Sequence, residues 1–191
     1  YDSDLQALLP RVGQAKSAAD YSLLASQLGS LAQSEPNRWE ASFWSAHCMV
    51  LQAFAETDSD KVDPILDAAE PVVEKLIKQQ PTEAEFYVLK AMLNQARIGV
   101  NPMLRGMKYS GRANDNLDLA LQFDAANPRA WHLKGSNTYF TPAMFGGGKK
   151  RAMPMLQKAD SLFKTYKPHS PYHPNWGADR NAEMLQSCET D

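Results

Sequence analysis

Three glycines followed by three cations, in the stretch FGGGKKR at residues 145–151, are the residues most suggestive of ligand chemistry. Glycine-rich loops that lead into a helix can bind phosphate through their backbone N–H groups. A nucleotide-binding phosphate loop requires glycine, four residues, and then Gly-Lys-Ser/Thr after a strand. With Gly148–Lys149 as the final pair, the leading position is Ala143 and the hydroxyl position is Lys150. The stretch is therefore not a nucleotide loop.

Two interpretations of this stretch stay open, an anion-binding site and an ordinary glycine turn. The backbone of Gly146–Gly148 leads into a helical pattern whose N-terminus favours negative charge, and Lys149–Arg151 add positive charge beside it. Three cations there also oppose the helix dipole, which costs stability unless an anion compensates. A turn in which glycine adopts positive φ and the cations stay solvated is the simpler interpretation.

The histidines and cysteines form no recognisable catalytic or metal-binding pattern. His169 and His173 are close in sequence, but they lie in a proline-broken segment with no third ligand nearby. Cys48 lies in an apolar helical run and is expected to be buried, and nothing in the sequence places it near Cys188 for a disulfide. Motifs of zinc proteases, serine hydrolases and paired carboxylates are absent. We therefore predict that the chain is not an enzyme and that it has neither a cofactor nor a metal ion.

Charge is unevenly distributed along the chain. The net charge of the 191 residues is −2, but residues 1–96 hold 14 acidic and 7 basic residues, whereas residues 97–191 hold 8 acidic and 13 basic ones. This asymmetry indicates a functional surface in the second half. The cations are dispersed, so nucleic-acid binding is not expected. The sequence has no apolar run of about 18 residues, so no membrane span is predicted.

Helical patterns dominate the sequence, and capping residues and prolines mark their expected ends. Ala, Leu, Gln and Met are abundant, and strand-like alternation is short. Asp63 followed by Pro64 predicts a helix start, and Thr82 with Glu85 predicts a reciprocal capping box. Pro71 would then lie inside a helix, where we expect a kink or a break.

Prolines recur just ahead of helical patterns, in SEPNRW, QQPTEA, ANPRAW and HPNW, with spacings of 45, 47 and 46 residues. Each interval holds two helical patterns. Such a pair cannot bury its apolar stripe alone and must stack on its neighbours. We predict one all-α domain over residues 1–191, with about four helical pairs and a C-terminal capping helix. The predicted pairs cover residues 3–33, 38–80, 83–125 and 128–166, and the predicted cap covers 175–188.

The stretch ALQFDAANPRAWHLKGSNTY, residues 120–139, resembles the tetratricopeptide repeat, a helix–turn–helix unit of about 34 residues. The resemblance implies a right-handed superhelix of helical pairs, in which Trp131 fills the wedge between helices and small residues allow close packing. The turn that contains FGGGK is longer than the family pattern, so we interpret it as an expanded joint, as we do 56–63 and 99–115. The matching residues are Ala120, Phe123, Ala125, Trp131, Gly135, Ala152, Leu156 and Ala159.

The chain as a whole resembles exported tetratricopeptide-like proteins of Bacteroides-type bacteria. The resemblance rests on NPRAW, YFTPAMFGGGKKRAMPMLQKA and FKTYKPHSPYHPNWG, which occur in that order. A more distant likeness is to the helical-repeat subunits associated with TRAP-type transporters. The first likeness implies an exported, periplasmic location, and a first residue Tyr1 is compatible with a removed signal peptide, although a cytoplasmic location stays open. The oligomeric state is open as well.

Repeat topology places the joints between paired helices on one edge of the array, so segments 99–112 and 141–150 are expected to be neighbours. We predict a cationic, aromatic-bearing edge that binds an anionic protein or peptide partner, and hence a binding scaffold without catalytic activity. The alternative function is a periplasmic small-molecule-binding component of a transporter, and the alternative role for the loops is to seal the array. The candidate binding residues are Arg105, Lys108, Tyr109, Arg112, Phe145, Gly146, Gly147, Gly148, Lys149, Lys150 and Arg151.

Overall fold

The computed structural model describes residues 1–190, which form nine α-helices and one short 3-10 helix and contain no strand. The predicted all-α helical-repeat fold is confirmed. The elements are α1 (Asp2–Gln14), α2 (Ala18–Ser34), α3 (Glu40–Ala55), α4 (Ser59–Gln79), α5 (Ala84–Ile98), α6 (Pro102–Phe123), α7 (Pro128–Phe140), η1 (Ala143–Phe145), α8 (Lys149–Thr165) and α9 (Ala178–Glu189).

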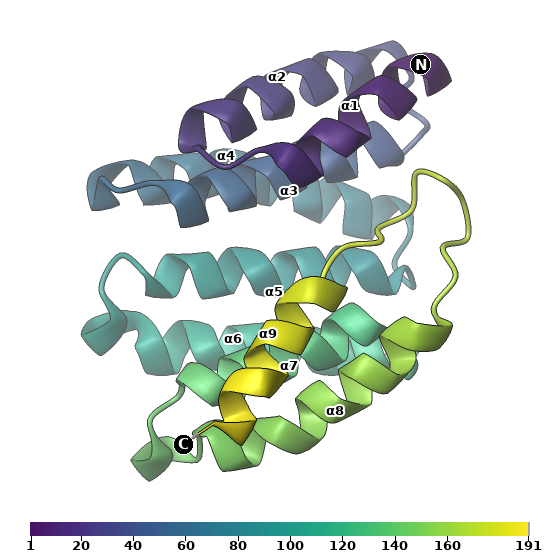
Figure 1. Cartoon of the computed structure of the whole chain (residues 1–191). Coiled ribbons are helices and arrows are strands. Elements are labelled where there is room, and N and C mark those ends of the chain that lie inside the picture. The colour runs from purple at the N-terminus through teal and green to yellow at the C-terminus, as the bar shows by residue number, and fades with distance from the viewer. Residues whose placement is uncertain (191) are drawn as a thin grey trace.

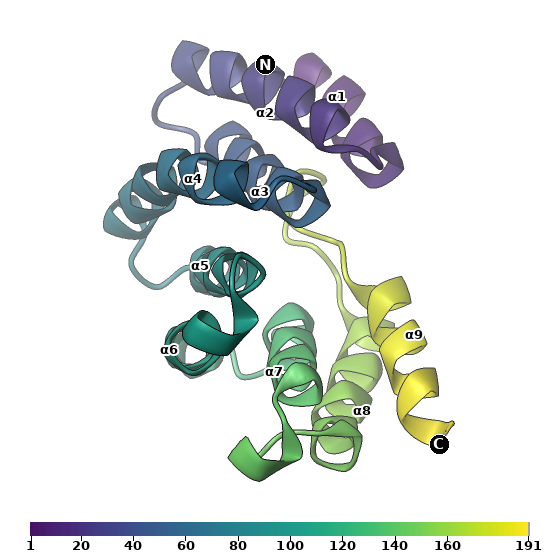
Figure 2. The ribbon, with the colours of Figure 1, turned by 90° about the vertical axis from the view of Figure 1, so that its left-hand side faces the viewer.

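Each helix from α1 to α8 packs on the next one along the chain, and α9 packs on α8. The helices form a stack that runs from α1 and α2 at one end to α7 and α8 at the other (Figure 1). Seen from the side, the stack is curved, and the segment that joins α8 to α9 crosses its hollow side (Figure 2). We name this segment, residues 166–177, the strap. It is tied to α3 by the Trp44 indole, whose Nε1 donates to the Tyr172 carbonyl at 2.8 Å.

Several predicted helix ends are wrong in detail. α4 begins at Ser59 with Asp58 as its cap, and it continues through Pro64 and Pro71 without a break. α5 is capped by Glu83, whose side chain accepts from the Glu85 N–H at 3.1 Å, so the capping box from Thr82 does not form. In both cases another acidic residue caps the helix, Asp58 five residues before Asp63 and Glu83 directly after Thr82.

All but the first three residues of the expected joint 99–115 are helical. Asn101 caps α6 by accepting from the Leu104 N–H at 3.1 Å, and Pro102 occupies the first helical position, where its missing N–H is not needed. Gly106 and Gly111 lie within the helix with no side chain near the position of a Cβ atom. Packing of α6 against α5 therefore stabilises a helix in the stretch that the sequence analysis interpreted as an expanded joint.

The close packing of α7 on α8 follows the small residues in the sequence. A Cβ atom at Gly135 would lie 2.6 Å from Cδ2 of Leu156, so only glycine permits this approach. Ala152, Leu156 and Ala159 are fully buried. Trp131 is half-buried, and its Nε1 donates to the Ala125 carbonyl at 3.0 Å.

A buried ion pair joins α5 to the start of α7. The Arg129 guanidinium and the Glu85 carboxylate are 0% and 1% exposed, and Nη2 lies 2.7 Å from Oε1. Asn127 donates to the same oxygen at 2.6 Å, and the guanidinium lies 4.3 Å from the centroid of the Tyr166 ring at the base of the strap. The pair connects two repeats and the strap at one point. The sequence analysis did not find this pair, because 44 residues separate its members.

Candidate functional site

An apolar groove of about 500 Å³ opens between the first half of α6 and the segment that joins α7 to α8. α6 contributes one face at helical spacing, and the end of α7 together with η1 contributes the other. We name it the α6–η1 groove. Its lining residues are Ile98, Pro102, Met103, Gly106, Met107, Ser110, Asn137, Phe140, Thr141, Pro142 and Phe145.

The walls of the groove are linked by Asn137 of α7. Its side-chain Nδ2 donates to the Ser110 carbonyl at 3.1 Å and to Oδ1 of Asn114 at 2.9 Å. This amide fixes the end of α7 against the middle of α6. The two segments that repeat topology predicted to be neighbours therefore both line the groove, although the first belongs to a helix instead of a loop.

The three glycines form a tight turn that supports η1. Their N–H groups donate to backbone carbonyls, from Gly146 to Ala143 at 3.1 Å, from Gly147 to Pro142 at 3.2 Å and from Gly148 to Thr138 at 2.9 Å. Gly146 and Gly148 adopt φ of 90° and 105°, which glycine alone adopts readily. Of the two interpretations, this geometry is that of the ordinary glycine turn, with all three N–H groups already used.

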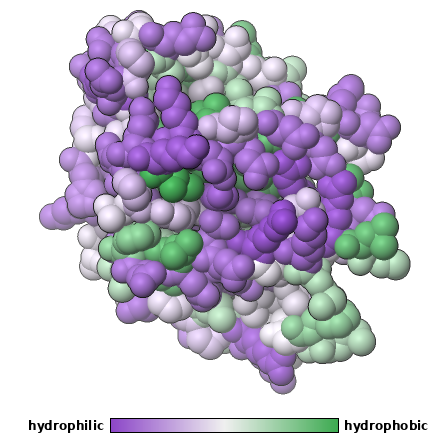
Figure 3. Space-filling view, turned by 180° about the vertical axis from the view of Figure 1, so that it is seen from behind, coloured by the Kyte–Doolittle hydropathy of each residue, from purple (hydrophilic) through white to green (hydrophobic). Residues whose placement is uncertain are grey.

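Large apolar side chains are unusually exposed at this groove. Six of the most exposed ones are Met103 at 94%, Met144 at 84%, Leu104 at 79%, Met107 at 77%, Phe140 at 67% and Phe145 at 57%. A space-filling view shows two apolar protrusions side by side at one edge, which by their place are the start of α6 and the η1 segment (Figure 3). Contiguous exposed apolar surface of this kind marks a binding site. The sequence analysis named only Phe145 among these side chains, since pattern alone does not separate an uncovered methionine from a buried one.

The cations of the predicted edge have different surroundings. Arg105 is engaged within the protein, because its guanidinium donates to both oxygens of Asp63 at 2.9 Å and 2.7 Å. The sequence analysis gave Arg105 as a candidate binding residue, but an acid of α4 already occupies its guanidinium. Lys108 and Arg112 are exposed and lie 5.3 Å and 5.4 Å from the centroid of the Tyr109 ring.

The cations after the glycine turn lie at the start of α8. Lys149 Nζ donates to the Thr190 carbonyl at 2.9 Å, and Arg151 Nη1 donates to the Ala143 carbonyl at 3.5 Å. Lys150 is exposed. Within residues 1–190, no carboxylate forms an ion pair with these three cations, nor with Lys108 or Arg112.

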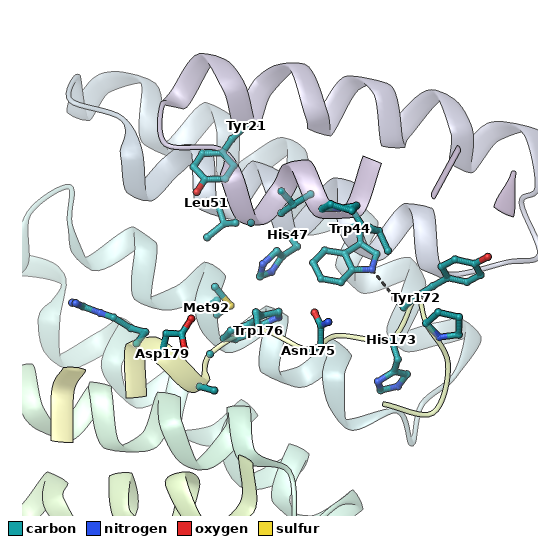
Figure 4. A pocket seen from close by; sticks show the side chains of 18 of the residues that line it. Tyr21, Trp44, His47, Leu51, Met92, Tyr172, His173, Asn175, Trp176 and Asp179 are labelled. Atoms are coloured by element: carbon teal, nitrogen blue, oxygen red, sulfur yellow. Dashed lines mark hydrogen bonds between the residues drawn. The ribbon is translucent and has the colours of Figure 1, made fainter. Parts of the chain in front are cut away.

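A second cavity of about 900 Å³ lies under the strap on the hollow side (Figure 4). Its wall contains His47, which is 2% exposed and lies between the rings of Phe43 and Trp176, at centroid distances of 6.0 Å and 5.2 Å. Burial lowers the pKa of His47 to about 3, so the ring is neutral. The side chains labelled in Figure 4 come from α2, α3, α5, the strap and the start of α9.

The strap cavity is the weaker candidate for an open site. The His47 ring is 2% exposed and stacks on Phe43 and Trp176, so it is not open to a ligand in this conformation. Nδ1 of His47 and Nε1 of Trp176 are buried without a hydrogen-bond partner among the described residues. Asp179 and Arg180 lie on the lining and bring opposite charges to it. The sequence analysis did not predict this cavity, whose walls come from both ends of the chain.

Neither metal-site nor membrane-spanning geometry is found in residues 1–190. No group of three or more His, Cys, Asp or Glu residues is placed to hold a metal ion there, and no helix among them is both long and apolar enough to span a bilayer. Cys48 and Cys188 are both buried and free, so they do not form a disulfide.

Comparisons with known proteins find a similar solved structure. No protein-family model and no curated protein sequence matches the chain. Among solved structures, it is similar to the HusA haemophore from Porphyromonas gingivalis, with a TM-score of 0.90 and 28% identity over 100% of this chain and 94% of that one. The tetratricopeptide resemblance is not supported by a family match, whereas an origin among Bacteroides-type bacteria agrees with the source of this neighbour. The chain is thus similar, over its whole length, to a haemophore.

Proposed function

We propose that the chain binds haem, or a closely related porphyrin, in the α6–η1 groove, and that it does so without catalysis. The observation that carries this proposal is the groove itself, an apolar slot with exposed methionine and phenylalanine side chains. The similarity to a haemophore over the full length supports the choice of ligand. This ligand replaces the protein or peptide partner expected from the sequence.

The chemistry of the groove suits a flat amphipathic ligand. A porphyrin has two wide apolar faces and, in haem, two carboxylates at one edge. Methionine and phenylalanine side chains from α6 and η1 can cover the faces, because flexible thioethers adapt to a ring and aromatic rings stack on it. At about 100° per residue, Lys108 and Arg112 lie on the face of α6 away from the groove. Lys149 and Lys150, which follow the lining residue Phe145 closely in sequence, are the candidates to receive the carboxylates.

Apolar contact is the larger contribution to affinity. Covering one fully exposed methionine or phenylalanine contributes about 1.5–3 kcal/mol, so three such side chains supply roughly 4–9 kcal/mol before the cost of association. An exposed ion pair contributes at most about 1 kcal/mol. The cations therefore orient the ligand and accelerate its association, while the groove retains it.

Iron coordination has a minor part in this proposal. The lining contains no histidine, cysteine or tyrosine, and the thioethers of Met103 and Met107 are the only soft donors on it. Contacts with the macrocycle then carry the binding. Metal-free protoporphyrin should bind with an affinity within about tenfold of that of haem.

The test is a titration of haem and of metal-free protoporphyrin, followed by absorbance and by quenching of tryptophan fluorescence. Met107→Asp and Phe145→Asp place a charge on the apolar walls and should each weaken binding at least tenfold, since a buried unpaired charge is costly. Phe54→Asp is the matched control, because Phe54 is 51% exposed on α3, outside the groove. It should leave binding unchanged.

The strap cavity is tested in the same titration. Gln6→Trp narrows that cavity from α1, and it should not affect binding. If Gln6→Trp abolishes binding while Met107→Asp and Phe145→Asp do not, the ligand lies under the strap and the assignment to the groove is wrong. If the parent chain binds neither porphyrin, the proposed function itself is wrong.

We also propose that the protein acts outside the cytoplasm. A protein that captures free haem must meet it outside the cytoplasm, before the haem enters the cell. The resemblance to exported proteins agrees with this location. Detection of the protein in the periplasmic or extracellular fraction of its own cells would support the proposal, and its confinement to the cytoplasmic fraction would refute it.

A further inference from the structure

The methionines of the chain fall into two groups that differ sharply in exposure. The sequence contains eight methionines. Met103, Met107 and Met144 are 94%, 77% and 84% exposed, whereas Met92 and Met184 are 6% and 5% exposed and the other three are partly buried. The exposed group belongs entirely to the start of α6 and to η1, on the two protrusions beside the groove (Figure 3).

We propose that these three methionines, the groove methionines, are a modification site whose oxidation to sulfoxide releases the ligand. The inference rests on the proposed function. The oxidant is a peroxide or a hypohalous acid, which supplies one oxygen atom and removes two electrons from the thioether sulfur. With hydrogen peroxide the O–O bond breaks, a new S–O bond forms, and water leaves.

Access makes oxidation selective for this group. A two-electron oxidant must reach the sulfur atom, and helix packing protects the sulfur atoms of the buried methionines. Met107 lies on the lining of the groove together with Met103, and Met144 lies between the lining residues Pro142 and Phe145. An oxidant in solution therefore meets the groove methionines first when the groove is empty.

Oxidation changes the property on which binding depends. A sulfoxide is polar and carries a strong hydrogen-bond acceptor, whereas the groove offers few donors, because Asn137 already donates to α6. A ligand that covers a sulfoxide leaves this acceptor without water. We expect oxidation of the groove methionines to raise the porphyrin Kd about tenfold or more.

An apolar wall does not by itself require methionine. Leucine would give similar apolar surface with no sensitivity to oxidants, and volume-conserving exchange between the two is well tolerated. Leu104, which is 79% exposed beside Met103, shows that leucine is accommodated on this part of α6. Thioethers at these three positions therefore add reversible reactivity to the groove, since sulfoxide reductases restore the thioether.

The experiment treats the ligand-free chain with increasing hydrogen peroxide and maps each methionine by peptide mass spectrometry. Met103, Met107 and Met144 should be oxidised before the other five, and the porphyrin Kd should rise in step with their oxidation. Methionine sulfoxide reductase should restore the affinity. Met103→Leu/Met107→Leu/Met144→Leu should show the same porphyrin Kd before and after peroxide treatment, each compared within the variant, whereas Met49→Leu, on α3, should keep the peroxide effect.

Two results would overturn this inference while leaving the proposed function intact. One is preferential oxidation of buried methionines, and the other is complete oxidation of the groove methionines with an unchanged porphyrin Kd. Failure of the untreated chain to bind porphyrin is a different outcome, which refutes the proposed function and with it the release mechanism. In that case, the binding of an apolar fluorescent dye to the groove can be measured before and after oxidation. This measurement shows whether the modification alters the apolar surface.

Discussion

The buried pair of Arg129 and Glu85 is the most demanding test of the fold, because it joins two repeats far apart in sequence. Replacing Glu85 by Gln removes the charge that compensates Arg129 and leaves a guanidinium that is 0% exposed. Replacing Arg129 by Met leaves the carboxylate uncompensated instead. The double variant Glu85→Leu/Arg129→Met removes both charges and keeps an apolar side chain at each position.

The magnitude follows from the burial of both groups. Breaking a buried ion pair by removing one partner costs about 3–5 kcal/mol of unfolding free energy, whereas replacing both partners with apolar residues is often neutral or stabilising. Arg129 donates three hydrogen bonds to Glu85, at 2.7–3.0 Å, so the geometry is near the favourable limit. Its Nη1 is already buried without a partner among the described residues, so the site has no spare acceptor when Glu85 is lost. We expect losses of about 3–5 kcal/mol for each single variant and a much smaller loss for the double variant.

Urea unfolding followed by circular dichroism measures these free energies and gives a double-mutant cycle. A loss below about 1 kcal/mol for either single variant, which is the value for an exposed ion pair, would show that water reaches the pair and would refute the reasoning from burial. A double variant as unstable as the singles would show that packing around these side chains, and not the uncompensated charge, dominates.

Two further predictions concern charge at the rim and buried histidines. Charge reversal by Lys149→Glu and Lys150→Glu should slow the association of porphyrin and weaken the dependence of its rate on salt, while the dissociation rate should change little. Stopped-flow measurements at two salt concentrations can show this. An unchanged association rate would exclude these lysines from the rim. Burial lowers the pKa of His47 to about 3 and that of His132 to about 4, so their contribution to stability is complete above the unfolded pKa near 6.5 and is lost as the pH falls below it. At pH 5 each histidine should then lower the free energy of unfolding by about 2 kcal/mol, as urea unfolding at pH 7 and pH 5 can measure. His47→Phe should reduce that loss. Equal stability at both pH values would contradict the burial of the rings.

Helix content and the repeated pairing were predictable because their signals are local. Prolines and small polar caps decide where a helix can start, and they act within a few residues. The start of α8 at Lys149 is an example, since the glycine turn ends at Gly148 and the helical pattern begins directly after it. The stretch 99–115 was mispredicted for the converse reason. Its glycines weaken a helix locally, but contacts with α5 outweigh that penalty.

The candidate site was predictable only in part. The sequence analysis brought segments 99–112 and 141–150 together and named Phe145 and the cations, but it treated Arg105 as available. Asp63, 42 residues earlier, holds that guanidinium. The methionines were missed because an apolar residue on a helix is normally covered by a neighbour. Their three-to-four-residue spacing beside Pro102 is the signal that could have indicated an apolar face.

The sequence by itself determined an all-α chain built from helical pairs, because capping, proline placement and apolar periodicity act over a few residues. Only the tertiary structure decided which apolar side chains stay uncovered and which cations are already paired. Both properties depend on which residues the rest of the chain places next to a side chain. The groove residues that face Met107, and Asp63, which pairs with Arg105, lie about 30 to 40 residues away in sequence.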